Sequence, residues 1–325
     1  MPQLVYYPDS RPGIRRKRAG RGFSYLAPDG TSIDDKEERA RLASMAVPPA
    51  YRDVWMSPKS NGHLWATGRD ARERKQYRYH PDWRAEREAT KYDDLAAFGA
   101  ALPKIRRKLR RQLSDDPGSE TFAIAAVIAL MDRTAMRIGS AAYASENRTY
   151  GATTLRNRHV SFEDGTIKLS YRAKGGKQIK RVVKDRTLNR TLGRLHDLPG
   201  AELISWLDDD GTPRAVRSDQ VNTWLSETVD RDGITAKTFR TWAGSEAALE
   251  TILGVDTPTI RSMSEAAAQR LGNTPTIARN SYIHPAVIAL AEDDDARNAL
   301  AQADPADVAE LRITERRLLD LLGGD

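Results

Sequence analysis

The stretch that most constrains the fold runs from Phe122 to Met136 and is apolar almost throughout. A helix of this composition has no polar face for solvent, so it must be buried on every side. The sequence therefore predicts a mainly helical domain packed around one central helix. Arg137-Ile138-Gly139 follows directly. An arginine at the end of a buried helix either interacts with the helix dipole or is a functional group directed out of the core.

The N-terminal part of the chain has a different pattern, in which strand-forming residues flank short polar turns. The turns at Pro28-Asp29-Gly30 and Ser60-Asn61-Gly62 predict two β-hairpins. The charged segment from Asp34 to Met45 predicts a helix between them, and from about Tyr92 the apolar spacing becomes helical. We therefore expect an α+β protein with two parts, a small β-rich N-terminal domain over residues 1–90 and a larger, mainly α-helical domain over residues 91–325.

The larger domain is expected to contain a small β-sheet. Strand formers around Asp164-Gly165 predict a hairpin, and the turn Lys174-Gly175-Gly176-Lys177 leads to a further strand from Ile179 to Val183. This turn lacks the spacing of a Walker phosphate loop, so we expect no nucleotide cofactor. One short helix is expected from Leu95 to Leu102, and a second opens at Pro103 and continues through Arg111. Another helix is expected to begin after Ser218 as its N-cap. The remaining expected helices are Thr235 to Leu253, Ile260 to Leu271 and one terminal helix from Ala306 to Leu322.

Charge is distributed unevenly along the chain. The whole sequence has 52 Lys and Arg against 45 Asp and Glu, a formal charge of +7. Residues 1–90 carry 18 basic and 12 acidic side chains, whereas the C-terminal tail, residues 293–325, carries 4 basic and 9 acidic ones. Basic regions ahead of an acidic tail favour a polyanionic partner such as nucleic acid, with a solvated charged surface as the alternative.

Several classes of site are excluded or disfavoured by composition. The chain has no cysteine, which excludes disulfides, zinc–thiolate sites and thiol nucleophiles. Its five histidines are far apart and lack metal-ligand spacing, so we expect neither a metal site nor a cofactor. No apolar run is long enough to cross a membrane, and the N-terminus lacks the apolar core of a signal peptide. These features predict a cytoplasmic protein, located at the nucleoid of a bacterial cell.

The segment from Gly68 to His80 alternates aromatic residues with basic and amide residues. On a strand, Tyr77 and Tyr79 share one face while Gln76 and Arg78 share the other. Such side chains can bind phosphates and base edges, whereas an exposed edge strand protected by charge is the structural alternative. The candidate DNA-binding residues here are Arg69, Lys75, Gln76, Tyr77 and Tyr79.

The segment from Leu271 to Pro285 predicts a short helix that ends in a tyrosine. Thr274 is a suitable N-cap, Pro275 suits the first turn, and Tyr282 falls near the end of the helix before Pro285. An isolated tyrosine is ordinarily core material. Upstream, Lys237 and Arg240 lie three residues apart and therefore share a helix face.

Together these motifs resemble the type IB DNA topoisomerases, in the small bacterial, poxvirus-like branch. The residues that carry the resemblance are Arg137-x-Gly139, Lys174 in a Lys-Gly-Gly-Lys turn, Lys237-x-x-Arg240-Thr-Trp and Asn273 nine residues before Tyr282. The segment from Gly68 to Tyr79 is similar to the DNA-contacting strand of that branch. The resemblance covers roughly residues 10–290 and leaves out the acidic tail.

The resemblance implies a monomer whose β-rich domain and helical catalytic domain form a clamp around duplex DNA. It implies that Tyr282 attacks a backbone phosphate, stays on the 3′ end and releases a 5′-hydroxyl without ATP or a required metal. Lys174 corresponds to the general acid for the leaving group, and Arg137, Arg240 and Asn273 to the groups that hold the phosphate oxygens.

Two positions depart from the poxvirus pattern. Asn273 stands where poxvirus members have histidine, so it can donate a hydrogen bond but cannot act as an acid. Ser140 replaces a basic residue of the poxvirus branch, so the resemblance does not extend to the base specificity of that branch. Lys237 and Tyr143 are similar to DNA contacts of the family.

Two alternatives remain open at this point. A tyrosine recombinase shares the Arg–Lys–Arg–Tyr chemistry, but recombinases usually have His-x-x-Arg where this chain has Lys237-x-x-Arg240, and they lack the β-rich module. A non-catalytic DNA-binding protein would have no special need for Tyr282.

Overall fold

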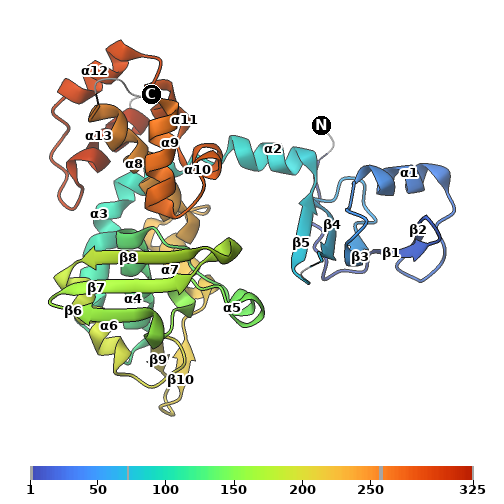
Figure 1. The fold of residues 1–325 in the computed structure, drawn as a ribbon, viewed down its shortest axis with the longest axis horizontal. Helices are drawn as coiled ribbons and strands as arrows, with labels where there is room; N and C mark the ends of the chain where they lie inside the picture. The colour runs from blue at the N-terminus through green and yellow to red at the C-terminus, as the bar shows by residue number, and fades with distance from the viewer. Residues whose placement is uncertain (1–2, 72, 256–258, 324–325) are drawn as a thin grey trace. The chain divides into compact units, whose positions relative to one another are not determined.

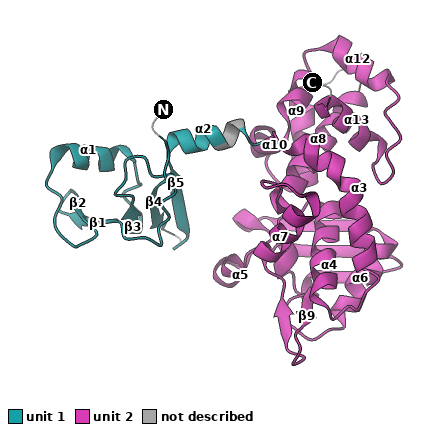
Figure 2. Cartoon of the chain, turned by 180° about the vertical axis from the view of Figure 1, so that it is seen from behind, with its two compact units in different colours: residues 1–91 teal, residues 92–325 magenta. Residues whose placement is uncertain are grey.

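The computed structural model describes residues 3–71, 73–255 and 259–323, so Arg72 and the last two residues of the acidic tail lie outside it. Helices and sheets are both present (Figure 1), as the α+β class requires. The chain divides into two compact units, Met1–Lys91 and Tyr92–Asp325 (Figure 2).

The N-terminal unit is built on a five-stranded antiparallel sheet with the strand order β2-β1-β3-β4-β5. Its core is formed by apolar side chains such as Ile14, Leu42 and Met56, which are almost fully buried. Strand β5 lies at the edge of the sheet. The elements are β1 Ile14–Ala19, β2 Gly22–Leu26, α1 Lys36–Ser44, β3 Arg52–Met56, β4 Leu64–Arg69, β5 Lys75–Tyr79 and α2 Pro81–Ala89.

The first hairpin turns earlier than the sequence predicts. Strands β1 and β2 pair from Arg15–Leu26 to Ala19–Gly22, so the chain reverses at Gly20, whose φ is +55°. The expected turn at Pro28-Asp29-Gly30 closes only an isolated bridge between Leu26 and Ser32. The basic run of β1 hid its strand character, because Arg15, Lys17 and Arg18 are exposed while Arg16 is half-buried and donates to the Val47 and Pro48 carbonyls.

The C-terminal unit surrounds α4, Glu120–Thr134, as its apolar sequence predicts. Helices α3 Leu95–Gln112, α6 Arg186–His196, α7 Ser218–Val229 and α8 Ala236–Leu253 contact it. The antiparallel sheet β6-β7-β8 lies in front of α4 and α6 in the view of Figure 1. The remaining elements are α5 Ala141–Asn147, β6 Val160–Glu163, β7 Thr166–Arg172, β8 Gln178–Lys184, β9 Ser205–Leu207, β10 Pro213–Ala215, α9 Ile260–Leu271, α10 Pro275–Tyr282, α11 Pro285–Ala289, α12 Asp294–Gln302 and α13 Ile313–Gly323.

Three expected helix boundaries are wrong. Pro103 does not open a helix but lies inside α3. A proline costs a helix about 3 kcal/mol, and here the buried apolar face of α3 outweighs that cost. Helix α7 has Arg217 rather than Ser218 as its N-cap, because the side chain of Gln220 accepts from the backbone N–H of Arg217. The terminal helix begins at Ile313, and α12 forms separately before it.

The acidic C-terminal segment packs on the unit through a buried ion cluster. The side chain of Glu315 is fully buried and accepts from Arg106 Nη2 at 2.8 Å, from Arg312 Nη2 at 2.9 Å and from Trp242 Nε1 at 3.3 Å. Arg106 also pairs with Asp132 of α4 at 2.9 Å. The segment therefore ties α13 to α3, α4 and α8.

Replacing Glu315 with alanine should lower the free energy of unfolding by about 3–5 kcal/mol, since it leaves buried arginine charge uncompensated. Glu265→Ala, which removes an exposed pair with Arg261, should cost under about 1 kcal/mol. Although burial would raise it, Arg106 lowers the pKa of Glu315 to about 2. The stabilisation should therefore be complete above the unfolded-state pKa and lost as the pH falls towards 2. Urea unfolding of the two variants measures these losses of free energy. Equal losses in Glu315→Ala and Glu265→Ala would contradict the role of the buried ion cluster.

Candidate active site

Four of the five predicted catalytic residues come together in the C-terminal unit, and Asn273 lies at their centre. Its side-chain oxygen Oδ1 accepts from Arg137 Nη2 at 2.6 Å and from Arg240 Nη2 at 3.3 Å. Two donors on Oδ1 fix the orientation of the amide, which leaves Nδ2 as a donor. Nδ2 and Arg240 Nε are buried and have no hydrogen-bond partner within the described residues. Buried donors of this kind are costly unless a ligand accepts from them.

Arg240 is almost fully buried, at 3% exposure. Its guanidinium donates to the backbone carbonyls of Ala135, at the end of α4, and of Leu271, at the end of α9. Burial lowers the pKa of Arg240, and the charge of Arg137 lowers it further. The side chain thus joins the ends of two helices and brings two guanidiniums to one place, which favours a bound anion.

Tyr282 is the last residue of α10, which begins at Pro275 with Thr274 as its N-cap, as predicted. Its ring centroid lies 5.0 Å from Arg240 Cζ, and the ring packs on a small apolar cluster formed by Ala135 and Leu271, at the ends of α4 and α9, and by Ala243 in the middle of α8.

Helix α8 holds the backbone of Tyr282 closely. A Cβ atom on Gly244 would lie only 2.6 Å from the Tyr282 carbonyl oxygen, so this approach requires glycine. The buried hydroxyl of Ser245 donates to the Tyr282 carbonyl at 3.4 Å and accepts from His284 N at 2.9 Å. Sequence reasoning missed both residues, because a Gly-Ser pair inside a helix carries no chemical signal of its own.

The surroundings of Tyr282 make its phenol more acidic. Burial is the largest single influence and alone would raise the pKa of Tyr282, but the combined effect of Arg240, Arg137 and Lys237 outweighs it. The net result is a lowered pKa. Because the phenolate is the nucleophilic form, this shift favours attack by Tyr282.

Lys174 is not joined to this cluster by any hydrogen bond or ion pair among the described residues. It is exposed in the turn between β7 and β8, where Gly175 and Gly176 both have positive φ, at 82° and 79°. Lys177 of the same turn instead donates to the Asn273 carbonyl at 3.4 Å. Sequence reasoning passed over Lys177, although the Lys-Gly-Gly-Lys pattern offered it as a second candidate.

The other two candidates of this unit are exposed. Lys237 lies in the first turn of α8, one turn before Arg240, where its charge acts on Tyr282. Tyr143 lies on α5 and is 45% exposed, and no hydrogen bond or ring contact joins it to the cluster within the described part of the chain.

In the N-terminal unit, Tyr77 and Tyr79 lie side by side on the edge strand β5, with ring centroids 6.3 Å apart and nearly parallel planes. They are 47% and 40% exposed. The other three candidates have partners within the unit: Arg69 donates to the Glu73 carbonyl, Lys75 pairs with Asp9, and Gln76 donates to Asp70.

Neither a metal cluster nor a membrane span is found in the part of the chain that the structure describes. Its His, Asp and Glu side chains form no group of three or more that could bind a metal ion. None of its helices is both long and apolar enough to cross a bilayer.

Comparison with known proteins identifies the family. The family model described as "Eukaryotic DNA topoisomerase I, catalytic core" matches residues 80–281, more than half of the chain. The model "Bacterial DNA topoisomerase IB, N-terminal domain" matches residues 22–70. The chain belongs to the type IB DNA topoisomerase family. It is an isomerase of that type, and Tyr282 directly follows the matched catalytic core.

Relatives agree with this assignment. DNA topoisomerase 1B of Acanthamoeba polyphaga mimivirus is 25% identical over 286 residues, which cover 83% of this chain and 85% of the relative. Among solved structures, XerH site-specific recombinase bound to difH substrate is 16% identical, with a TM-score of 0.39 over 60% of this chain and 52% of the recombinase. A second XerH structure, a post-cleavage complex with palindromic difH substrate, is also 16% identical, with a TM-score of 0.41 over 59% of this chain and 50% of the recombinase. This chain thus matches about half the length of the recombinase chains, and scores this low support no argument for the recombinase alternative.

Proposed function

We propose that this topoisomerase relaxes supercoiled duplex DNA by transient cleavage of one strand, with Tyr282 as the nucleophile. The observation that carries the proposal is the joint placement of Arg137, Arg240 and Asn273 beside a tyrosine whose pKa the two arginines help to lower. Tyr282 Oη attacks the scissile phosphorus and the bond to the 5′ oxygen breaks. The protein then remains on the 3′ phosphate and a 5′-hydroxyl is released.

The phosphate is held by the donors that lack partners in the free protein. Arg240 Nε and Asn273 Nδ2 supply two of them, and the guanidinium of Arg137 supplies another. Negative charge grows on the non-bridging oxygens at the transition state, and preorganised donors stabilise it there. Asn273 acts only as a hydrogen-bond donor, since an amide does not titrate.

Religation reverses these steps. The 5′-hydroxyl attacks the phosphotyrosyl ester and Tyr282 leaves. Because the ester conserves the energy of the original bond, the cycle requires neither ATP nor a metal ion. The alkoxide that leaves during cleavage is strongly basic and needs a proton, which we assign to Lys174 as general acid. Between cleavage and religation the broken strand rotates.

Both units carry residues that we propose to bind DNA. We assign duplex binding to the N-terminal unit through Arg69, Lys75, Gln76, Tyr77 and Tyr79, and to the C-terminal unit through Tyr143 and Lys237. The protein would act as a monomeric clamp around duplex DNA at the bacterial nucleoid. Binding should weaken steeply with salt, because Lys and Arg contacts release counterions from the DNA.

Plasmid relaxation without ATP and with excess EDTA tests this function. The protein should relax a supercoiled plasmid catalytically, whatever the plasmid's sequence. A requirement for ATP or Mg²⁺ would contradict the mechanism, and a requirement for two copies of one defined site, with exchange of strands between them, would favour a recombinase.

The pH dependence of cleavage should report the ionisation of Tyr282. The cleavage rate should rise with pH through the pKa of the phenol. Lys237→Gln removes a charge that lowers this pKa, so its profile should be displaced to higher pH. Arg261→Gln, a change on the exposed side of α9, should leave the profile in place. Single-turnover cleavage of a labelled duplex measures both profiles, and coincident profiles for Lys237→Gln and the unmodified protein would refute the assignment.

A further inference from the structure

A hollow of about 630 Å³ lies where β8, α8, α9 and the end of α4 meet. This volume is in the range of small-molecule sites. Its charged lining consists of five cationic side chains and two carboxylates, an excess of three positive charges: Arg133, Arg181, Lys184, Arg270 and Arg312 against Asp185 and Glu250.

Two of these cations, Arg181 and Arg270, are mostly buried and have no carboxylate partner within the described residues. Arg181 Nη2 donates to the Arg270 carbonyl at 2.8 Å, and Arg270 Nη1 donates to the Arg133 carbonyl at 3.2 Å. Arg181 Nη1 has no partner at all in the described chain. Glu246 is close enough to act on the pKa of Arg270, but its carboxylate pairs with Arg312 at 2.8 Å. Buried charges paired only with neutral carbonyls are costly, and an anionic ligand would offset that cost.

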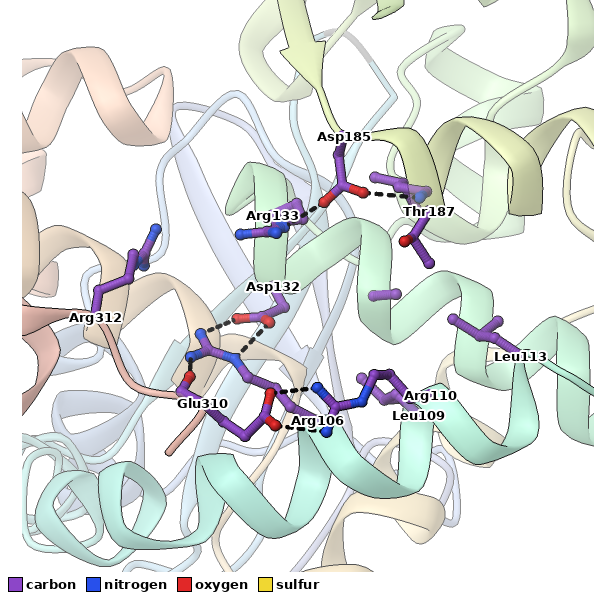
Figure 3. A pocket seen from close by; sticks show the side chains of 12 residues that line it. Arg106, Leu109, Arg110, Leu113, Asp132, Arg133, Asp185, Thr187, Glu310 and Arg312 are labelled. Carbon is purple, nitrogen blue, oxygen red and sulfur yellow. Dashed lines mark hydrogen bonds and ion pairs between the residues drawn. The ribbon is translucent and has the colours of Figure 1, made fainter. Parts of the chain in front are cut away.

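A neighbouring hollow provides an internal comparison (Figure 3). It measures about 310 Å³ and shares Arg133, Asp185 and Arg312 with the larger one. There every cation has a carboxylate partner: Arg106 with Asp132, Arg110 with Glu310, Arg133 with Asp185, and Arg312 with Glu246 and Glu315. The smaller hollow is therefore self-neutralised, and the unpaired charge is a property of the larger one.

We propose that the larger hollow is a binding site for a small phosphate-bearing polyanion, held by Arg181, Arg270 and Lys184. The planar guanidinium fork matches phosphate oxygens in bidentate geometry. Arg181, Lys184 and Arg270 have no ion-pair partner in the described chain, and three such cations suit a ligand with more than one negative charge. A hollow of about 630 Å³ suits a compact ligand rather than a second DNA segment. The proposed function of Tyr282 does not require this site.

Calorimetric titration of the full-length protein with inorganic pyrophosphate, at fixed ionic strength, tests the proposal. Saturable binding should weaken at least about tenfold in Arg270→Gln, which loses a charged donor. Lys184→Gln should weaken it about threefold, and because Lys184 is exposed this variant remains informative if Arg270→Gln misfolds. Arg190→Gln, an exposed change on α6 outside the hollow, should bind as the unmodified protein does.

A second comparison distinguishes this site from the scissile-phosphate site. Arg181 lines both the hollow and a small cavity beside Arg240, whereas Arg137 lines only that small cavity. Because Arg137 does not line the hollow, pyrophosphate affinity should be unchanged in Arg137→Ala. The proposal is overturned if the unmodified protein shows no saturable binding, or if Arg137→Ala loses affinity and Arg270→Gln keeps it. It is also overturned if a short DNA duplex, rather than pyrophosphate, shows the losses expected for Arg270→Gln and Lys184→Gln.

Discussion

Tyr282→Phe is expected to abolish both plasmid relaxation and the covalent protein–DNA adduct, a loss of more than about 10⁴-fold in rate, as for other catalytic nucleophiles. Only the hydroxyl is removed. The phenylalanine ring keeps its packing on Ala135, Ala243 and Leu271 and its place beside Arg240, so the fold and the affinity for duplex DNA should be retained. Denaturant trapping of the adduct and a filter-binding assay measure the two properties separately.

Tyr171→Phe is the matched control. Tyr171 is also buried and feels the charges of Arg137 and Arg240, but burial dominates and raises its pKa, opposite to the shift at Tyr282. A tyrosine with a raised pKa is a poorer nucleophile, so this variant should still form the adduct. Adduct formation by Tyr282→Phe, or its loss only in Tyr171→Phe, would show that the nucleophile is misassigned.

Lys174→Ala is expected to slow cleavage of ordinary DNA by about 10²–10⁴-fold, the usual contribution of a general acid. The defect should nearly vanish on a substrate with a 5′-thiol leaving group, because a thiolate leaves without being protonated. Single-turnover cleavage of the two substrates measures this ratio. A defect of the same size on both would rule out proton donation by Lys174.

Lys177→Ala separates the two lysines of the turn. In the free protein Lys177, not Lys174, contacts Asn273, so its loss should affect the position of the phosphate rather than the departure of the leaving group. The Lys177→Ala defect should therefore persist on the 5′-thiol substrate. Thiol rescue of Lys177→Ala alone would transfer the general-acid role to Lys177.

The sequence predicted the helices in which the local residue pattern and the tertiary packing favour the same structure. Helix α4 is apolar and buried over most of its length, from Phe122 to Met131, and α10 begins with the Thr-Pro pair that the sequence predicts as its start. It failed where tertiary contacts override a local signal. Pro103 usually ends a helix, but α3 continues through it because its Phe98 and Leu102 face the core. Helix α2 was not predicted, although His80 and Pro81 form its N-cap and first turn.

The residues of the candidate site also divide into those that a local pattern reveals and those whose role depends on tertiary contacts. Arg137, Arg240, Asn273 and Tyr282 were found because their chemistry is specific and their spacing matches a family. Ser245 and Gly244 were not found, because holding a backbone in place requires only a small side chain in one position of the fold. The partnerless Nδ2 of Asn273 could be recognised only once both arginines were placed on its oxygen.

The central claim is that Tyr282 becomes linked to a 3′ phosphate without help from ATP or a metal ion. A nicked suicide duplex, labelled on either side of the cleavage site and incubated with the protein in EDTA, tests it directly when the trapped adduct is digested and its peptide sequenced. We predict that the label 5′ of the break stays with a peptide containing Tyr282 and that the fragment on the 3′ side of the break, released from the same strand, carries a free 5′-hydroxyl. A linkage to the 5′ end, a different modified residue, or no adduct until Mg²⁺ is added would contradict the account.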